Sequence, residues 1–210
     1  MTPTHRIALA VPLLLAPALC AGQAPGAEAA PAAEAAAPVA AQPPLLPRND
    51  LPGLQNFGQV SEALYRGAQP TAEGFKQLKQ LGVKTVVNLR VTASDREAMA
   101  GLGLQHLELS FKPWHPEFED LAPFLKLFED SKNLPVFVHC KHGSDRTGTV
   151  VALYRMVHQG WTRERAIAEL PRFGFHEIWG NLRDYLKVIE IDALKAAIAA
   201  EKPTALEKVP

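Results

Sequence analysis

The stretch that most constrains this chain is residues 136–148, which read VFVHCKHGSDRTG. A short run of β-branched and aromatic residues is typical of a buried strand, and the apolar pattern after Gly148 is typical of a helix. The loop between them then turns its backbone N–H groups toward a helix N-terminus, where an anion is favoured. The same field favours Cys140 as the nucleophilic thiolate, and Arg146 supplies a planar fork of donors that suits phosphate. The sequence therefore predicts an oxyanion-binding loop that carries a nucleophile.

This loop resembles the H-C-x5-R-[S/T] motif of the cysteine-based protein tyrosine phosphatases, with His139, Cys140, Arg146 and Thr147 in the fixed positions. The likeness runs from about residue 56 to 186 and includes the segments LYRGAQPT and KTVVNLR. It is greatest to small dual-specificity-like phosphatases, both bacterial members and the atypical branch that contains inositol pyrophosphate phosphatases. The resemblance implies a phosphotyrosine-phosphatase-like α/β fold, with a mostly parallel sheet of about four to five strands and helices on both faces. The alternation of strand and helix patterns indicates the same class.

The resemblance also implies roles for the residues of the loop. Cys140 is expected to attack phosphorus and form a cysteinyl-phosphate, Thr147 to hydrogen-bond the sulfur, and His139 to orient the loop. The phosphate oxygens are expected to be held by the loop from its second residue to its arginine, which comprises Lys141, His142, Gly143, Ser144, Asp145 and Arg146. Lys141 and His142 either recognise further phosphate groups or are simply solvated. No cofactor is implied. His139 and His142 around Cys140 resemble a ligand cluster, but thiolate chemistry with Arg146 explains the same residues without a metal ion.

The general acid that protonates the leaving oxygen has more than one candidate. Asp145 precedes Arg146, as an aspartate does in myotubularin-type and bacterial lipid-phosphatase loops, and we prefer it slightly. Glu117 ends a segment, WHPE, that resembles the Trp-Pro-Asp loop of the superfamily. Glu119 and Asp120 follow closely. The carboxylates of Glu117, Glu119 and Asp120 also suit the start of a helix. Elsewhere, we expect Arg66 and Arg90 to be structural, with a place at the pocket rim as the alternative. His176 and Asn181 are candidates for positioning water, and Trp161 and Trp179 are expected to be packing residues.

The ends and the charge of the chain bound its organisation. Residues 1–24 have one arginine, an apolar run and small residues, as a cleaved secretory signal does, so we expect export to the periplasm or the medium. Lipid attachment at Cys20 is less favoured because Leu19 is bulky. Residues 25–47 are rich in Ala and Pro and predict a disordered linker, which leaves 48–210 as the catalytic domain. Once the signal is removed Cys140 is the only cysteine, so no internal disulfide is expected.

The charge balance limits the partners of this chain. It has 22 basic and 22 acidic residues in all. From Arg48 onward the counts become 21 (22 less Arg6) and 20 (22 less Glu28 and Glu34), so no basic field predicts nucleic-acid binding. We expect a monomer without a membrane span after signal cleavage.

The sequence also predicts the approximate positions of the elements. Thr71 and Thr162 are expected helix caps, and Ser94 with Glu97 forms a capping-box pattern. The remaining expected elements are a strand pair within 56–66, strands at 83–89, 105–109 and 136–139, and helices at 71–81, 117–130, 147–159, 162–170 and 178–200.

The function predicted from these observations is hydrolysis of phosphomonoesters through a cysteinyl-phosphate. The substrate is expected to be a protein carrying phosphotyrosine, phosphoserine or phosphothreonine, or else a phosphoinositide or inositol phosphate. Two alternatives belong to other classes: an inactive phosphate-binding module, and a rhodanese-like sulfurtransferase, which also carries a Cys in a loop before a helix. The intact Cys140 and Arg146 favour the phosphatase over both.

Overall fold

The computed structural model describes residues 44–117 and 120–209. The predicted signal segment, the predicted linker up to residue 43, and Glu119 lie outside the described residues. In the described part of the chain, no helix combines the length and the apolar character needed to cross a membrane.

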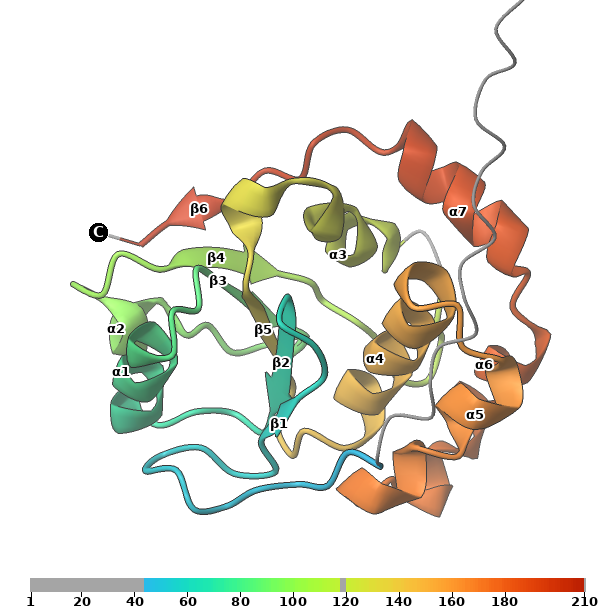
Figure 1. Ribbon diagram of the computed structural model, residues 1–210, viewed down its shortest axis with the longest axis horizontal. Coiled ribbons are helices and arrows are strands. Elements are labelled where there is room, and N and C mark those ends of the chain that lie inside the picture. The colour runs from blue at the N-terminus through green and yellow to red at the C-terminus, as the bar shows by residue number, and fades with distance from the viewer. Residues whose placement is uncertain (1–43, 118–119, 210) are drawn as a thin grey trace, which may run out of the picture. The chain divides into compact units, whose positions relative to one another are not determined.

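A six-stranded sheet organises the domain, and its four central strands are parallel (Figure 1). In spatial order the strands are β1 (Gly58–Gln59), β2 (Leu64–Gly67), β5 (Val136–His139), β3 (Thr85–Asn88), β4 (Gln105–Glu108) and β6 (Glu207–Lys208). The short edge strands β1 and β6 run antiparallel to their neighbours. The α/β class and the mostly parallel sheet are confirmed. The strand pair expected within 56–66 corresponds to β1 and β2. Strand β6 was not expected, because two residues are too few to leave an alternating pattern in the sequence.

Helices cover both faces of the sheet, as predicted (Figure 1). Successive residues of a strand point to opposite faces, so Phe137 packs with α1 and α2 while Val136 and Val138 pack with the larger helical layer. The first layer consists of α1 (Ala72–Gln80) and α2 (Arg96–Met99). The second consists of α3 (Ala122–Lys126), α4 (Asp145–His158), α5 (Arg163–Ile167), α6 (Gly180–Val188) and α7 (Ile191–Ala200). Strand β5 is therefore buried on both faces, and Cys140 directly follows its last residue.

Three expected helices differ from the structure. The helix expected at 117–130 begins only at Ala122, because Pro123 suits a first turn and not a helix interior, and it tightens to a 3-10 turn at Leu127–Glu129. The helix expected at 178–200 is divided, since Ile189 is extended and buried, and the Arg163 guanidinium donates to its carbonyl oxygen at 2.7 Å. Before α2 the N-cap is Asp95, not Ser94, and its side chain does not cap the helix. That carboxylate turns into the protein instead.

Candidate active site

The loop that follows β5 is held in a tight conformation by its neighbours. Gly143 has φ +73°, and a Cβ at this position would lie 2.5 Å from the backbone of Gly67 and Ala68, so only glycine fits. The Lys141 carbonyl oxygen accepts a hydrogen bond from the Gln69 N–H at 3.3 Å. Strand β2 and the residues after it thus pack against one side of the loop and fix its conformation.

The backbone N–H groups of residues 141–144 are free to bind an oxyanion. Within the described residues, none of these four amides donates a hydrogen bond. They lie at the N-terminal end of α4, which begins at Asp145. Free amides and a helix N-terminus together favour a phosphate group at this position. This is the cradle that the motif predicts.

Two arginines and an asparagine hold the loop. The Arg146 guanidinium donates to the carbonyl oxygen of Leu89, just after β3, at 3.0 Å. Arg66 is fully buried, donates to the Gly143 carbonyl oxygen at 2.7 Å and lies over the Phe173 ring. Burial lowers the pKa of Arg66 to about 10, so it remains cationic at neutral pH. Arg66 is therefore structural, as expected from the sequence.

Asn56 is a loop-holding residue that the sequence analysis missed. Its amide donates to the carbonyl oxygens of His142 and Phe173, each at 3.0 Å. Among the described residues it is the single non-glycine residue with positive φ, at 51°. An asparagine before a strand pattern is a weak signal, because the same residue is common in ordinary turns.

The nucleophile opens onto a small cavity of about 130 Å³. Its lining residues are Pro113, Cys140, Lys141, His142, Asp145, Arg146 and Trp179. The predicted nucleophile, phosphate-binding arginine and favoured acid are thus brought to one place. Trp179 was expected to be a packing residue, but it forms a wall of this cavity.

The structure separates the candidate acids. Asp145 is buried in the cavity wall, and its Oδ1 accepts a hydrogen bond from the His176 N–H at 2.8 Å. The His176 ring nitrogen Nδ1 lies 3.0 Å from the other carboxylate oxygen. Glu117 is 51% exposed, pairs with His115 at 2.7 Å and is not among the residues that line the cavity. Asp120 is exposed as well. Of the described candidates, Asp145 alone borders the cavity of Cys140.

His139 lies beneath the loop in a buried polar network. Its Nδ1 is 3.2 Å from the Cys140 carbonyl oxygen, and its Nε2 is 3.0 Å from Asp95 Oδ2. Asp95 also pairs with Arg90 at 2.5 Å and lies 3.9 Å from His106. The loop-orienting role of His139 stays a prediction, and its contacts are those that such a role requires.

The surroundings shift the pKa values of two residues in this network. Burial opposes ionisation of Asp95, but His139, Arg90 and His106 outweigh it, so the pKa of Asp95 is lowered. Burial lowers the pKa of His106. The sequence analysis missed Asp95, because a carboxylate directly before a helix suggests an ordinary cap.

Thr147 is fully buried, and its hydroxyl makes no hydrogen bond with any described residue. The expected bond to the Cys140 sulfur is therefore not formed in this structure. Asn181, a candidate for positioning water in the sequence analysis, donates to the Pro113 carbonyl oxygen at 2.6 Å and so fixes a wall of the cavity.

One group of side chains at the rim has the composition of a cation site. The ligand atoms of His142, Asp145 and His176 lie within 4.8 Å of one another. The sequence analysis expected no metal and considered a different pair of histidines, His139 and His142. The hydrogen bonds between Asp145 and His176, together with the ring contact of 5.8 Å between His142 and His176, already give these three residues a structural explanation, so no step below uses a metal.

Two larger cavities adjoin the catalytic one. The first, of about 520 Å³, has a mostly apolar wall that includes Val91, Ala93 and Trp114. It shares four residues with the catalytic cavity: Pro113, Lys141, Arg146 and Trp179. The second, of about 480 Å³, lies on the other side of the loop and is bordered by the cationic or titratable residues Lys141, His142, Arg172 and His176.

Comparisons with known proteins agree with this geometry. A family model described as "DSP-PTPase phosphatase fused to NAD+ Kinase" matches residues 54–178. The dual specificity protein phosphatase TpbA of Pseudomonas aeruginosa strain UCBPP-PA14 is 36% identical over 151 residues, which cover 69% of this chain and 67% of that protein. The inositol diphosphatase DSP3 of Arabidopsis thaliana is 30% identical over 125 residues, covering 56% of this chain and 61% of that protein.

The fold is likewise shared with solved structures. The crystal structure of P. aeruginosa TpbA superposes with a TM-score of 0.66 at 31% identity and covers 75% of this chain and 98% of that one. A crystal structure of a TpbA variant in complex with pTyr also gives a TM-score of 0.66, at 29% identity, covering 77% of this chain and 99% of that one.

Proposed function

Because this chain belongs to the DSP-PTPase family and is a phosphatase of the protein-tyrosine or dual-specificity type, we propose that it cleaves phosphomonoesters through a cysteinyl-phosphate on Cys140. One observation carries the proposal. Cys140, Arg146 and Asp145 line a single small cavity beside four backbone amides that have no partner among the described residues. A nucleophile, a cationic fork and a proton donor are the groups that such a reaction requires.

The first half of the reaction transfers the phosphoryl group to sulfur. The Cys140 thiolate attacks phosphorus, and the bond from phosphorus to the leaving oxygen breaks. Arg146 and the amides of residues 141–144 hold the equatorial oxygens, whose negative charge must be stabilised in the transition state. Asp145 in its acid form gives its proton to the leaving oxygen, and His176 keeps the carboxyl group oriented.

The second half restores the enzyme. Water attacks the phosphorus of the cysteinyl-phosphate, and the Asp145 carboxylate takes the proton that water loses. The bond between phosphorus and sulfur breaks, which releases inorganic phosphate and the Cys140 thiolate. The buried Thr147 hydroxyl is the donor that stabilises the departing sulfur.

The test compares full-length protein with three variants under reducing conditions. Cys140→Ser should abolish turnover of an aryl phosphate and still bind phosphate. Asp145→Asn should slow an alkyl phosphate more than a nitrophenyl phosphate, because a good leaving group needs little proton donation. Glu117→Gln, a matched carboxylate outside the cavity, should behave as wild type. Equal loss of both substrates in Asp145→Asn, or the selective loss in Glu117→Gln, would reassign the acid. Thiosulfate turnover by wild type would favour the sulfurtransferase alternative.

For the substrate, we favour phosphotyrosine in a protein. The catalytic cavity has Pro113 and Trp179 as walls, which suit the flat face of an aryl ring, and it joins the apolar cavity that contains Trp114. The relative TpbA has been crystallised in complex with pTyr. A phosphotyrosine peptide with an apolar neighbouring residue should therefore have a higher kcat/KM than the same peptide with phosphoserine.

A specific observation favours a second candidate, an inositol phosphate or phosphoinositide. The cavity on the other side of the loop is bordered by Lys141, His142, Arg172 and His176, which suit additional phosphate groups. Arg172→Gln separates the two candidates. It should lower kcat/KM for an inositol polyphosphate if that is the substrate, and it should leave phosphotyrosine hydrolysis unchanged.

A further inference from the structure

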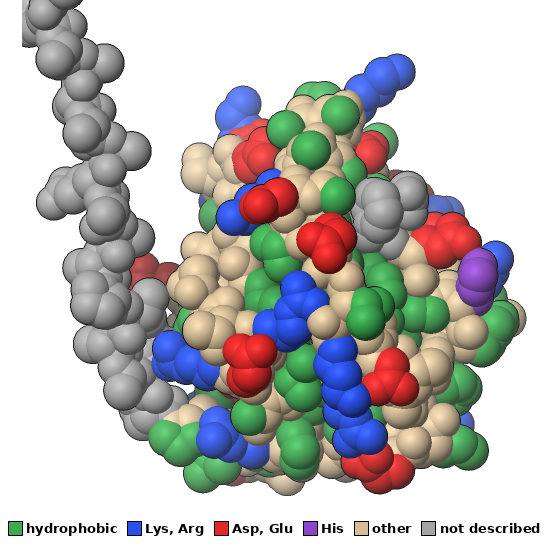
Figure 2. All heavy atoms as spheres, turned by 90° about the vertical axis from the view of Figure 1, so that its right-hand side faces the viewer, with side chains coloured by type: hydrophobic (Ala, Val, Ile, Leu, Met, Phe, Trp, Pro, Cys, Tyr) green, Lys and Arg blue, Asp and Glu red, His purple; other side chains and the backbone are tan. Residues whose placement is uncertain are grey.

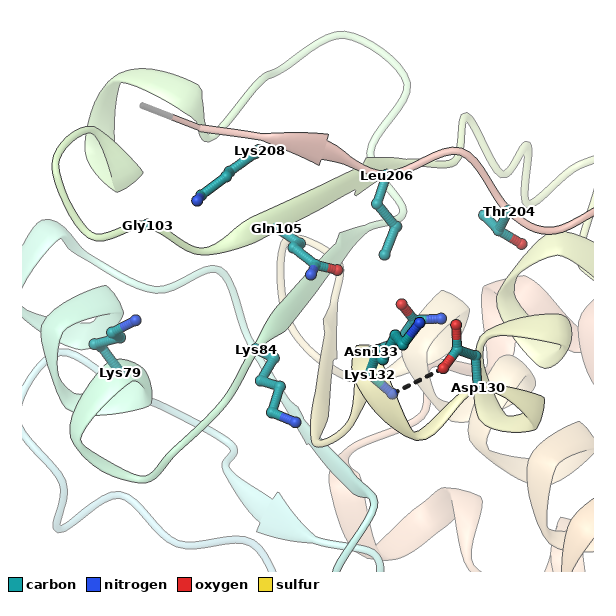
Figure 3. A pocket seen from close by; sticks show the side chains of 10 residues that line it. All are labelled: Lys79, Lys84, Gly103, Gln105, Asp130, Lys132, Asn133, Thr204, Leu206 and Lys208. Atoms are coloured by element: carbon teal, nitrogen blue, oxygen red, sulfur yellow. Dashed lines mark hydrogen bonds between the residues drawn. The ribbon is translucent and has the colours of Figure 1, made fainter.

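A second concentration of positive charge lies far from Cys140. Four lysines surround a cavity of about 490 Å³, and we call it the lysine pocket: Lys79, Lys84, Lys132 and Lys208. Figure 3 shows these side chains coming from separate elements around one space. Lys79 belongs to α1, Lys84 directly precedes β3, Lys132 lies in a 3-10 turn before β5, and Lys208 belongs to β6.

The lysine pocket lies at the N-terminal ends of the parallel strands, and the catalytic loop lies at their C-terminal ends. Gln105, which also lines it, begins β4, whereas Cys140 follows the last residue of β5. The central strands are parallel and four residues long, so their N-terminal and C-terminal ends are separated by about 13 Å along the strand axis. A ligand in this pocket does not occupy the catalytic site.

The four lysines of the pocket differ in their pairing from three lysines elsewhere in the domain. Among the described residues, none of the four forms an ion pair with a carboxylate. By contrast, Lys76, Lys126 and Lys187 each pair with an acidic residue three positions away, at 3.8, 2.8 and 2.7 Å. The face that carries α6 and α7 likewise mixes acidic and basic side chains (Figure 2). The lysine pocket is therefore a local excess of positive charge.

The one carboxylate in the pocket is occupied. Asp130 accepts a hydrogen bond from the Lys132 backbone N–H at 2.9 Å, and in this way it caps the 3-10 turn. With four lysines and one aspartate, the pocket carries three excess positive charges, whereas residues 48–210 as a whole carry one. Such an excess inside a concave site attracts multiply charged anions.

Other groups give the pocket directional contacts. The Gln105 side-chain oxygen accepts a hydrogen bond from the Thr85 hydroxyl at 3.3 Å, which leaves its amide nitrogen as a donor. Figure 3 shows the Gln105 side chain pointing into the space between the lysines. Gln105 and Lys208 are also paired in register across β4 and β6. Because side chains alternate along a strand, Lys208 faces the pocket while Glu207 pairs with Arg96 on the other side.

We propose that the lysine pocket is a second, non-catalytic site for an anion with two or more phosphate groups. Its volume is that of a small-molecule site, and its lysines are placed to contact several phosphates at once. Either a soluble polyphosphorylated molecule or the headgroup of a phosphorylated lipid presents this chemistry. Lys208 and Leu206 come from the last described segment, so occupancy would also hold β6 against β4.

The test records backbone amide NMR shifts of full-length Cys140→Ser protein titrated with tripolyphosphate. The amides of Gly103 and Gln105 report on the lysine pocket, and the Gly143 amide reports separately on the catalytic loop. Saturable shifts of the first two are expected. Lys84→Gln/Lys132→Gln should weaken that binding roughly thirtyfold. This factor follows because each lysine near an anionic surface contributes about 1 kcal/mol, and two such contacts are lost. The control Lys76→Gln/Lys187→Gln makes the same charge change outside the pocket and should bind as its parent.

A second arm distinguishes the sources of the anion. Phosphatidylcholine vesicles with and without phosphatidylinositol bisphosphate are sedimented with the same proteins. Binding that the pocket variant loses and the control keeps assigns a lipid headgroup, whereas tripolyphosphate binding without vesicle binding assigns a soluble anion. Shifts confined to Gly143, or equal affinities of the pocket variant and the control in both arms, would overturn the proposal. Both readouts measure binding and not turnover, so they do not depend on the catalytic proposal.

Discussion

Replacing Asp95 with asparagine removes the charge from the buried network beneath the nucleophile. The Asp95 side chain is only 2% exposed and lies between Arg90 at 2.5 Å and His139 at 3.0 Å. Asparagine has nearly the same shape and keeps one oxygen acceptor, so packing is preserved. The change therefore isolates the loss of a buried negative charge next to cationic or titratable partners.

The structure sets the size of the effect. Removing one partner of a buried ion pair costs about 3 to 5 kcal/mol. Because the asparagine oxygen can still accept from Arg90, and Arg90 keeps its bond to the Asn88 side chain at 3.0 Å, we expect the lower end, about 3 kcal/mol. For a domain of this size, that lowers the melting temperature by about 6 to 12 °C. Freed of Asp95, the His139 ring should hold the Cys140 carbonyl less firmly, which we expect to reduce kcat by roughly ten- to a hundredfold.

Thermal melts and steady-state kinetics test both effects. Asp50→Asn is the matched control, since Asp50 pairs with Arg48 at 2.6 Å on the surface, and it should leave the melting temperature and kcat unchanged. The pKa of Asp95 is lowered in the fold, so its stabilising effect is present above the unfolded pKa of about 3.9 and is lost as pH falls through the folded pKa. The difference between wild type and Asp95→Asn should therefore disappear in acid. An unchanged melting temperature, or an equal effect of Asp50→Asn, would refute the reasoning.

Three further variants test the loop, the pH response and the core. Gly143→Ala should abolish turnover, because its Cβ would meet backbone at 2.5 Å; Gly101→Ala, with similar positive φ but open space, should keep it. Burial lowers the pKa of His158, so the free energy of unfolding should fall as pH drops through about 6.5, and His158→Gln should show a smaller fall in urea titrations. In the wild type, the buried Arg155 guanidinium pairs with Glu169 at 2.8 Å, and Glu169→Gln leaves its charge uncompensated. We expect this variant to lower the free energy of unfolding by about 3 to 5 kcal/mol in urea titrations, and a loss below 1 kcal/mol would contradict the reasoning.

Local sequence determined the elements that position the nucleophile. The run VFVH before Cys140 has the composition of a doubly buried strand, and β5 spans those four residues. Thr71 and Thr162 were identified as helix caps from residue type, and each accepts a backbone N–H as expected. These features depend on contacts within a few residues, so a linear pattern is sufficient to predict them.

Contacts between segments that are distant in the sequence determined which charged side chains lie together. The sequence favoured Asp145 over Glu117 only slightly, whereas the fold places Asp145 beside Cys140 and leaves Glu117 on the surface. Asp95 reads as an ordinary helix cap, yet folding turns it inward to His139, 44 positions away in the chain. The lysine pocket has no linear signature either, because its four lysines come from elements spread over more than half of the described chain. The residue types available to the site follow from the sequence, but which charges meet is a property of the packed sheet and its loops.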